Sequence, residues 1–196
     1  NATAAQALMT TQLAACTGLL GWLAVEFRRT GSATTLGAAS GAVAGLVAIT
    51  PGAGFVPAWA AMLIGLAAGA VGELAVKLKF RMGYDDSLDV VAVHGMCGLL
   101  GTVSVGLFAT RLVNATGRHE GLLLGGGLHQ LGMQALAIVV TLAWAFPVTY
   151  GIARLVKATV GLRVTRETEI EGLDLSVHAE SAYDIGALHA TGRSRS

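Results

Sequence analysis

Five long apolar segments constrain the fold of this chain more than any other feature. They cover residues 4–27, 36–50, 58–76, 89–109 and 128–156. A helix needs about 20 mainly apolar residues to cross the ~30 Å hydrocarbon core of a bilayer. Inside that core the backbone polar groups must bond to one another, which favours helices. The sequence therefore predicts an all-α polytopic membrane protein, with a transmembrane part over 1–160 and a tail over 161–196.

The composition agrees with a helical membrane protein. Of the 196 residues, 54% are hydrophobic and 13% are charged, against about 25% charged residues in soluble domains. The net charge of +1 offers no basic surface, so we expect no nucleic-acid partner. Cys16 and Cys97 lie in apolar segments without metal-binding spacing. We therefore expect two buried free thiols, no metal and no cofactor.

Glycine spacing predicts close helix packing in the second and third segments. Gly37, Gly41 and Gly45 recur every four residues, and Gly65 and Gly69 repeat that spacing. Small residues in this pattern let the backbones of neighbouring helices come into contact. We expect these glycine faces to contact helices that lie outside this chain.

His94 is the one ionisable side chain between Val90 and Ala109. If Asp86 is the helix N-cap, His94 lies about 12 Å along the axis. An ionisable group deep in a bilayer is costly and indicates a functional site. The alternative is a histidine that is hydrogen-bonded within the packed bundle. Val90 lies one turn before His94 on the same face and is expected to line any pore, and Ser40 is a candidate pore-adjacent residue.

Three carboxylates have structural interpretations. Asp86 and Asp89 resemble a capping arrangement that satisfies free N–H groups at the start of the fourth helix. Glu73 precedes Lys77 by four residues, the favourable order for an ion pair within one helix. An intramembrane enzyme using Asp89 and His94 is an open alternative, but α-helical geometry separates them by about 140° around the axis. We therefore predict a protein that is not an enzyme.

Basic residues predict the orientation of the chain. Arg28 and Arg29 follow the first apolar segment, and Lys77, Lys79 and Arg81 follow the third. The tail begins with Arg154, Lys157, Arg163 and Arg166. By the positive-inside rule these sites are cytoplasmic. The tail is too short to form a core of its own. It is either a solvated disordered segment or an ordered strap on the cytoplasmic face.

Three stretches carry a resemblance to a known family. They read Asp85-Asp86-x-x-Asp89-Val-x-x-Val-His94-Gly95, the Gly37–Gly45 stretch followed by Thr50-Pro51, and Gly161-Leu-Arg-Val with Gly172-Leu-Asp-Leu-x-x-His178-x-Glu180-x-Ala-Tyr183. Together they resemble the ammonium transporter family (Amt/Mep/Rh). The chain is similar to the C-terminal half of such a protein: the last five helices of an eleven-helix inverted-repeat bundle, with the cytoplasmic tail.

The resemblance implies transport of ammonium or ammonia through a narrow apolar pore. His94, followed by Gly95, matches the second of the family's paired pore histidines. The first would come from the N-terminal half. The resemblance also implies a homotrimer in the lipid of the cell membrane, with one pore per subunit. A membrane ammonium sensor that signals through its tail is the alternative.

In the tail, the resemblance implies a docking surface for a cytosolic regulator of the PII type. The matching positions are Asp174, His178, Glu180 and Tyr183. Ala179 stands where the family pattern usually has glycine. If this position needs a positive φ, alanine strains the turn and weakens regulatory docking.

Imidazole chemistry agrees with the implied role of His94. A bare ammonium ion is very costly to place in an apolar pore, whereas neutral ammonia is not. A neutral imidazole accepts a hydrogen bond on one nitrogen and donates from the other. Burial disfavours the charged form, so we expect His94 to be neutral. Two linked imidazoles can then guide the substrate and relay its proton.

Overall fold

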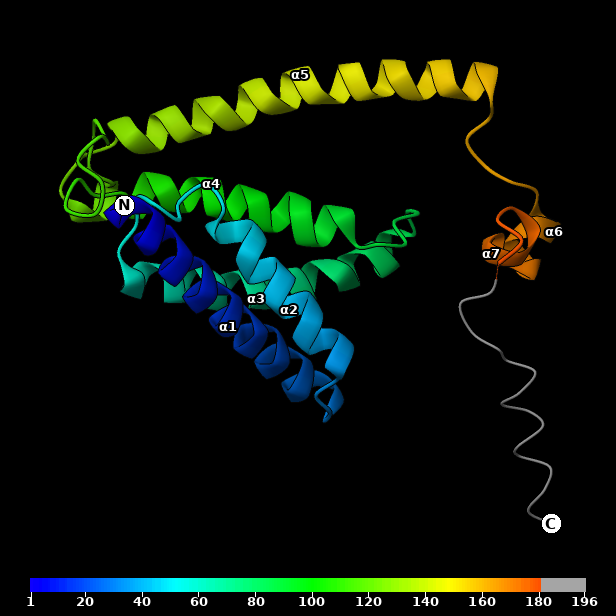
Figure 1. Ribbon diagram of the computed structural model, residues 1–196, viewed down its shortest axis with the longest axis horizontal. Coiled ribbons are helices and arrows are strands. Elements are labelled where there is room, and N and C mark those ends of the chain that lie inside the picture. The colour runs from blue at the N-terminus through cyan, green and yellow to red at the C-terminus, as the bar shows by residue number, and fades with distance from the viewer. Residues whose placement is uncertain (181–196) are drawn as a thin grey trace, which may run out of the picture. The chain divides into compact units, whose positions relative to one another are not determined.

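The computed structural model describes residues 1–180, and every regular element in that range is a helix (Figure 1). This confirms the all-α fold class. The elements are α1 (Ala2–Thr30), α2 (Thr35–Ile49), α3 (Ala58–Met82), the π-helix η1 (Val90–Met96), α4 (Cys97–Phe108), the 3₁₀-helix η2 (Leu122–Leu124), α5 (His129–Thr159), α6 (Arg166–Glu171) and α7 (Leu173–Ser176).

The chain forms two compact units, and each is described separately. The first ends at Leu142 and the second begins at Ala143. The boundary lies inside α5, whereas the sequence analysis placed a division after residue 160. Helix α5 runs from His129 to Thr159 with Pro147 inside it.

Within residues 1–180, four helical stretches are long and apolar enough to cross a membrane: α1, α3, the continuous η1–α4 stretch and α5. Helix α2 is a shorter apolar helix. Both α1 and α3 continue beyond the expected ends at residues 27 and 76. They stop at Gly31 and Gly83, whose φ angles of 76° and 68° are left-handed. Glycine takes this conformation without a Cβ penalty, which makes it a common helix terminator.

Helix α1 packs against both α2 and α3 (Figure 1). A Cβ atom at Gly45 would overlap the carbonyl oxygen of Ala14, and one at Gly69 would overlap the carbonyl oxygen of Gly18. Both contacted residues belong to α1. The glycine faces therefore permit close packing, as predicted, but their partner is inside this chain. The expectation that they contact helices outside it is wrong.

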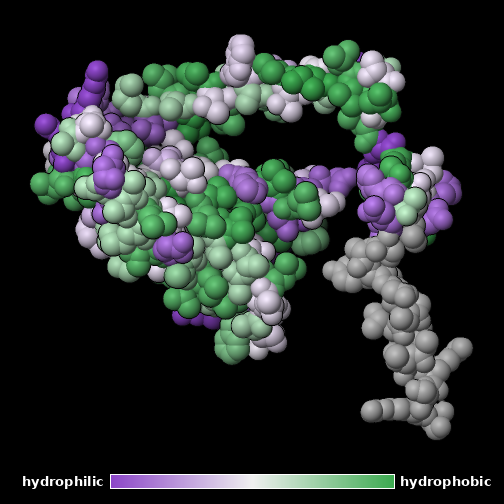
Figure 2. Space-filling model, viewed as in Figure 1, coloured by the Kyte–Doolittle hydropathy of each residue, from purple (hydrophilic) through white to green (hydrophobic). Residues whose placement is uncertain are grey.

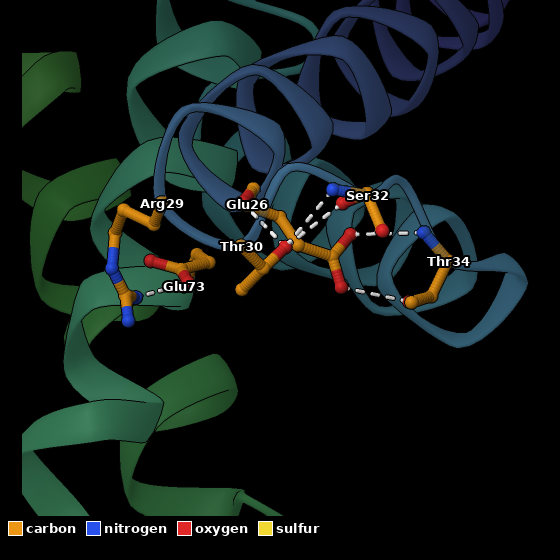
Figure 3. Close-up of polar contacts among 6 residues, drawn as sticks. All are labelled: Glu26, Arg29, Thr30, Ser32, Thr34 and Glu73. Carbon is orange, nitrogen blue, oxygen red and sulfur yellow. Dashed lines mark hydrogen bonds and ion pairs between the residues drawn. The ribbon is translucent and has the colours of Figure 1, made fainter.

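Carboxylates link the C-terminal part of α1 to the start of α2 and to the body of α3 (Figure 3). Glu26 accepts hydrogen bonds from the backbone N–H and the hydroxyl of Thr34, at 3.2 and 2.8 Å. Thr34 in turn is the N-cap of α2 and accepts from the N–H of Gly37 at 2.9 Å. A Cβ at Gly37 would occupy the space of the Glu26 carboxylate. Gly37 thus makes room for the Glu26 carboxylate.

Glu73 pairs with Arg29 of α1 (Figure 3), so the expectation that it pairs with Lys77 is wrong. The Glu73 side chain is only 8% exposed. Its second oxygen, Oε2, has no hydrogen-bond donor among residues 1–180. Burial leaves Glu73 dependent on a partner from another helix, which the spacing along α3 does not reveal.

Large apolar side chains cover much of the visible surface of the bundle and of α5 (Figure 2). In the most apolar stretch of α5 no residue is buried. Trp144 is 72% exposed and Phe146 is 75% exposed. The Cys97 thiol is buried, as expected, but Cys16 is exposed, so that expectation is wrong. Such a surface requires lipid or further protein to cover it.

Replacing Gly69 with alanine should destabilise the bundle. The new methyl group would overlap the carbonyl oxygen of Gly18, which is backbone and cannot rotate away. Overpacking of this kind costs about 1–3 kcal/mol, which exceeds the roughly 1 kcal/mol gained from helix propensity. Thermal unfolding of the purified protein checks this.

The matched control is Gly132→Ala, because a Cβ at Gly132 meets nothing within 4 Å. The control should unfold at the wild-type temperature or slightly above it. Equal unfolding temperatures for Gly69→Ala and the wild type would contradict the packing of α3 on α1.

Candidate functional site

The helix that carries His94 begins as a π-helix, over Val90–Met96. Its N-cap is Asp89, in the left-handed conformation with φ 55°. The expectation that Asp86 is the N-cap is therefore wrong, and His94 lies nearer the start of the helix than expected. The Asp86 carboxylate nevertheless accepts hydrogen bonds from the N–H groups of Val90 and Val91, each at 2.9 Å. It satisfies two of the free donors at the helix start.

Lys79 anchors this helix start to α3. Its Nζ donates to the carbonyl oxygen of Asp86 at 2.8 Å and forms an ion pair with Asp89. The Lys79 side chain is 9% exposed. Sequence analysis counted Lys79 only as a loop charge, whereas it lies in the last turn of α3. Because its charge is paired with Asp89, that carboxylate is not available for a dyad with His94.

His94 is exposed and borders a groove of about 420 Å³ between η1–α4 and the first half of α5. Its imidazole has no hydrogen-bond or ionic partner within residues 1–180. The α4 side includes Gly95 and Gly98, and the α5 side includes Ile138. A Cβ at Gly98 would meet nothing within 4 Å, so the backbone floor beside the imidazole is open. π-Helical turns are rare, and they are frequent at functional sites.

The groove brings together only part of the predicted site. His94 and Gly95 line it, but Val90 does not, although Val90 is exposed. Ser40 is half-buried on α2 and also lies outside the lining. Their pore roles remain predictions.

Sequence analysis also missed residues of this site. Thr102 and Thr141 line the same groove. Thr102 follows His94 by eight residues, a signal that was present in the sequence. The position of Thr141 depends on how α5 packs. Among residues 1–180, no three His, Cys, Asp or Glu side chains are close enough to hold a metal ion.

The described part of the tail contains two short helices, α6 and α7. Thr165 caps α6, and Arg163 pairs with Glu169 at 2.9 Å on the surface. The pKa of Glu167 lies below its ordinary value because its carboxylate accepts a hydrogen bond from its own backbone and another from Thr165. The first turn of α6 is therefore negatively charged, which suits the helix dipole.

Ala179 has a φ of 54°, the left-handed conformation that favours glycine. The condition under which alanine strains this turn, a positive φ at the position where the family pattern has glycine, is therefore met. The turn is closed by a hydrogen bond from the N–H of Glu180 to the carbonyl oxygen of Asp174, at 2.9 Å. Alanine pays roughly 1–2 kcal/mol for this conformation. The predicted tail residue Tyr183 lies outside the described residues.

Comparison with known proteins identifies the relationship. A sequence profile described as the Ammonium Transporter Family matches residues 1–183. The chain belongs to the ammonium transporter family. It is 47% identical to an ammonium transporter of Mycobacterium tuberculosis over 189 residues, which are 94% of this chain and 40% of that protein. It is 45% identical to a putative ammonium transporter of Methanothermobacter thermautotrophicus, over 93% of this chain and 45% of that protein.

Solved structures agree with the family assignment. Candida albicans Mep2 superposes with a TM-score of 0.76 at 35% identity, covering 84% of this chain and 37% of that one. A structure titled "Sensor Amt Protein" superposes with a TM-score of 0.78 at 28% identity, covering 90% of this chain and 42% of that one. This member of the ammonium transporter family thus spans less than half the length of the relatives that it matches.

Replacing Asp86 with alanine should weaken the start of the π-helix. Two N–H groups, those of Val90 and Val91, lose their acceptor. Loss of a helix-capping side chain costs about 0.5–2 kcal/mol. The unfolding temperature of Asp86→Asn should fall between those of Asp86→Ala and the wild type, because the asparagine amide has one acceptor oxygen. Thermal unfolding of the transporter measures the series.

Ser87→Ala is the control, since Ser87 makes no hydrogen bond with the η1 backbone among the described residues. It should match the wild type. An unfolding temperature for Asp86→Ala equal to that of Ser87→Ala would show that the Asp86 carboxylate does not stabilise the helix start.

Proposed function

We propose that this chain forms one wall of a transmembrane conduit for ammonium or ammonia, and that His94 handles the substrate and its proton. The observation that carries the proposal is the position of His94 beside the groove between η1–α4 and α5, with its imidazole unpartnered within residues 1–180. Membership of the ammonium transporter family supports the choice of substrate.

The surroundings of His94 suit ammonia better than a bare ion. The groove lining is mainly apolar, with Leu99, Ile138 and Leu142 among its residues. A desolvated ammonium ion is disfavoured there, while neutral ammonia is tolerated. An imidazole offers one acceptor and one donor nitrogen, so it can take a proton from ammonium or pass one on. A second histidine from outside this chain would complete the paired relay.

The conduit wall needs polypeptide beyond this chain. Exposed apolar faces on α4 and α5, including Val103 and Val139, support burial against an N-terminal half. The complete transporter would be a homotrimer in the cell membrane, with the tail in the cytoplasm. Basic residues at the ends of α1 and α3, Arg28 and Arg81 among them, support that orientation.

A membrane ammonium sensor is the alternative function. One of the similar structures is titled as a sensor protein. The described residues of this chain contain only short helices after α5 and no separate signalling domain. Measured flux through the complete protein separates a transporter from a protein that only senses.

Replacing His94 should alter both passage and proton handling. His94→Ala removes the imidazole, and His94→Glu substitutes an acid of different charge, so we expect ammonium-evoked current and methylammonium uptake to change in both variants. A tenfold change in transport rate corresponds to about 1.4 kcal/mol in the free-energy barrier to passage. His129→Ala is the control, because His129 lies at the start of α5, outside the groove, and its ring contacts that of His119 at a tilted angle.

Current and uptake that match the wild type in both His94 variants would remove His94 from the mechanism. A loss of equal size in His129→Ala would indicate a general effect of histidine replacement rather than a role for the groove.

The tail is proposed to dock a PII-type cytosolic regulator. Helices α6 and α7, with Asp174, His178 and Glu180, supply an acidic and histidine-containing surface in the tail. Complementary charge is available from the basic residues at the ends of α1 and α3. The left-handed Ala179 should make this surface less well ordered than a glycine would.

Truncation after Val164 should abolish regulator binding, because it removes α6 and α7. Ala179→Gly should tighten binding by about fivefold, since relief of roughly 1 kcal/mol of backbone strain favours the docked turn. Titration of the purified transporter with a PII-type protein measures both effects. Ala158→Gly, inside α5, is the control and should not tighten binding. Equal affinity after truncation would exclude the tail as the docking site.

A further inference from the structure

Two hydroxyl groups interrupt the apolar lining of the groove beside His94. Thr102 comes from α4 and Thr141 comes from α5, so they lie on different walls. Both residues lie in the unit that ends at Leu142. No role in transport has been assigned above to either residue.

The Thr102 hydroxyl can only accept a hydrogen bond from a molecule in the groove. Its Oγ1 donates to the carbonyl oxygen of Gly98 at 2.9 Å, which uses its one proton. A hydroxyl oxygen keeps two lone pairs after donating. Thr102 is half-buried and lines the groove, so a molecule in the groove can reach this oxygen. The position suits a molecule that carries N–H donors.

The path between Thr102 and His94 is kept open by glycine. Gly95 and Gly98 line the groove between them, and a Cβ at Gly98 would meet nothing within 4 Å. Eight residues of α-helix correspond to about 12 Å, so the hydroxyl and the imidazole lie at different heights along the helix. Thr102 lies on the side of His94 that leads towards the loop after α4.

Thr141 adds a hydroxyl from the opposite wall. Its hydroxyl makes no hydrogen bond within residues 1–180, in contrast to Thr102 and to Thr159 further along α5, which donates to the carbonyl oxygen of Leu155 at 3.0 Å. An exposed hydroxyl without a protein partner is free to bond to a polar molecule in the groove.

We propose that Thr102 and Thr141 form a hydrogen-bonding station that receives ammonia or ammonium on the loop side of His94. The substrate donates N–H to the Thr102 oxygen and bonds to the Thr141 hydroxyl before it reaches the imidazole. Two oxygens are too few to replace the hydration shell of Na⁺ or K⁺, which channels achieve with rings of carbonyl oxygens. This inference rests on the proposed transport function and names further substrate-contacting residues for it.

The test uses the complete transporter carrying Thr102→Val or Thr141→Val. Valine keeps the branched shape and removes the hydroxyl, so each variant should lower the maximal rate of methylammonium uptake and of ammonium-evoked current by about three- to tenfold, the worth of one hydrogen bond. Thr102→Ser should retain the wild-type rate because it keeps the hydroxyl. The fold-loss of transport rate in the double variant should be smaller than the product of the two single fold-losses, because both hydroxyls bond to one molecule.

Thr159→Val is the matched control. Thr159 makes the same hydroxyl-to-carbonyl bond as Thr102 but does not line the groove, so its rate should not change. Thr141 is exposed, so Thr141→Val tests the station even if Thr102→Val unfolds.

Two results would overturn the station. One is a wild-type transport rate in Thr141→Val and in a folded Thr102→Val, together with an altered rate in His94→Ala. That result would leave the proposed transport function standing. The other is an equal loss in Thr102→Ser and Thr102→Val, which indicates a packing role. Absence of any effect in the His94 variants would instead overturn the proposed function itself.

Discussion

Direct backbone contact between helices is the constraint on which the rest of this structure depends. In a bilayer no hydrophobic force drives helices together, so they associate by close van der Waals packing. Here α1 supplies the surface, and glycines such as Gly45 and Gly69 bring α2 and α3 onto it. The side chain of Trp22, 6% exposed, fills the space beside Gly72. Helices α1, α2 and α3, packed in this way, form the base against which η1 and α4 lie.

The position of His94 follows from that base through a short chain of polar contacts. Lys79, in the last turn of α3, holds the Asp86 carbonyl and the Asp89 carboxylate. Asp86 then satisfies the first N–H groups of η1. The buried residues Ala92 and Val93 pack inward, which leaves His94 on the exposed side of the π-helix. The fold thus presents the imidazole to a groove rather than burying it among the core helices.

Features set by local chemistry were predictable from the sequence, and features set by contacts between helices were not. Apolar length predicted the membrane helices, and the glycine spacing predicted close packing. The replacement of a family glycine by Ala179 raised the question of strain, and the structure gives this residue a left-handed φ. The partner of Glu73, the contact of the glycine faces with α1 and the place of Thr141 on the groove all depend on which helices become neighbours. The π-helical start was missed because α-helical geometry was assumed for the whole segment.

The account's central claim is that His94 works in a conduit whose remaining wall lies outside this chain. The most direct test reconstitutes residues 1–196 in vesicles, alone and together with the proposed N-terminal half, and measures ammonium flux. The account predicts no flux from the chain alone, and flux that depends on His94 when both parts are present. Robust His94-dependent flux from this chain alone would contradict it.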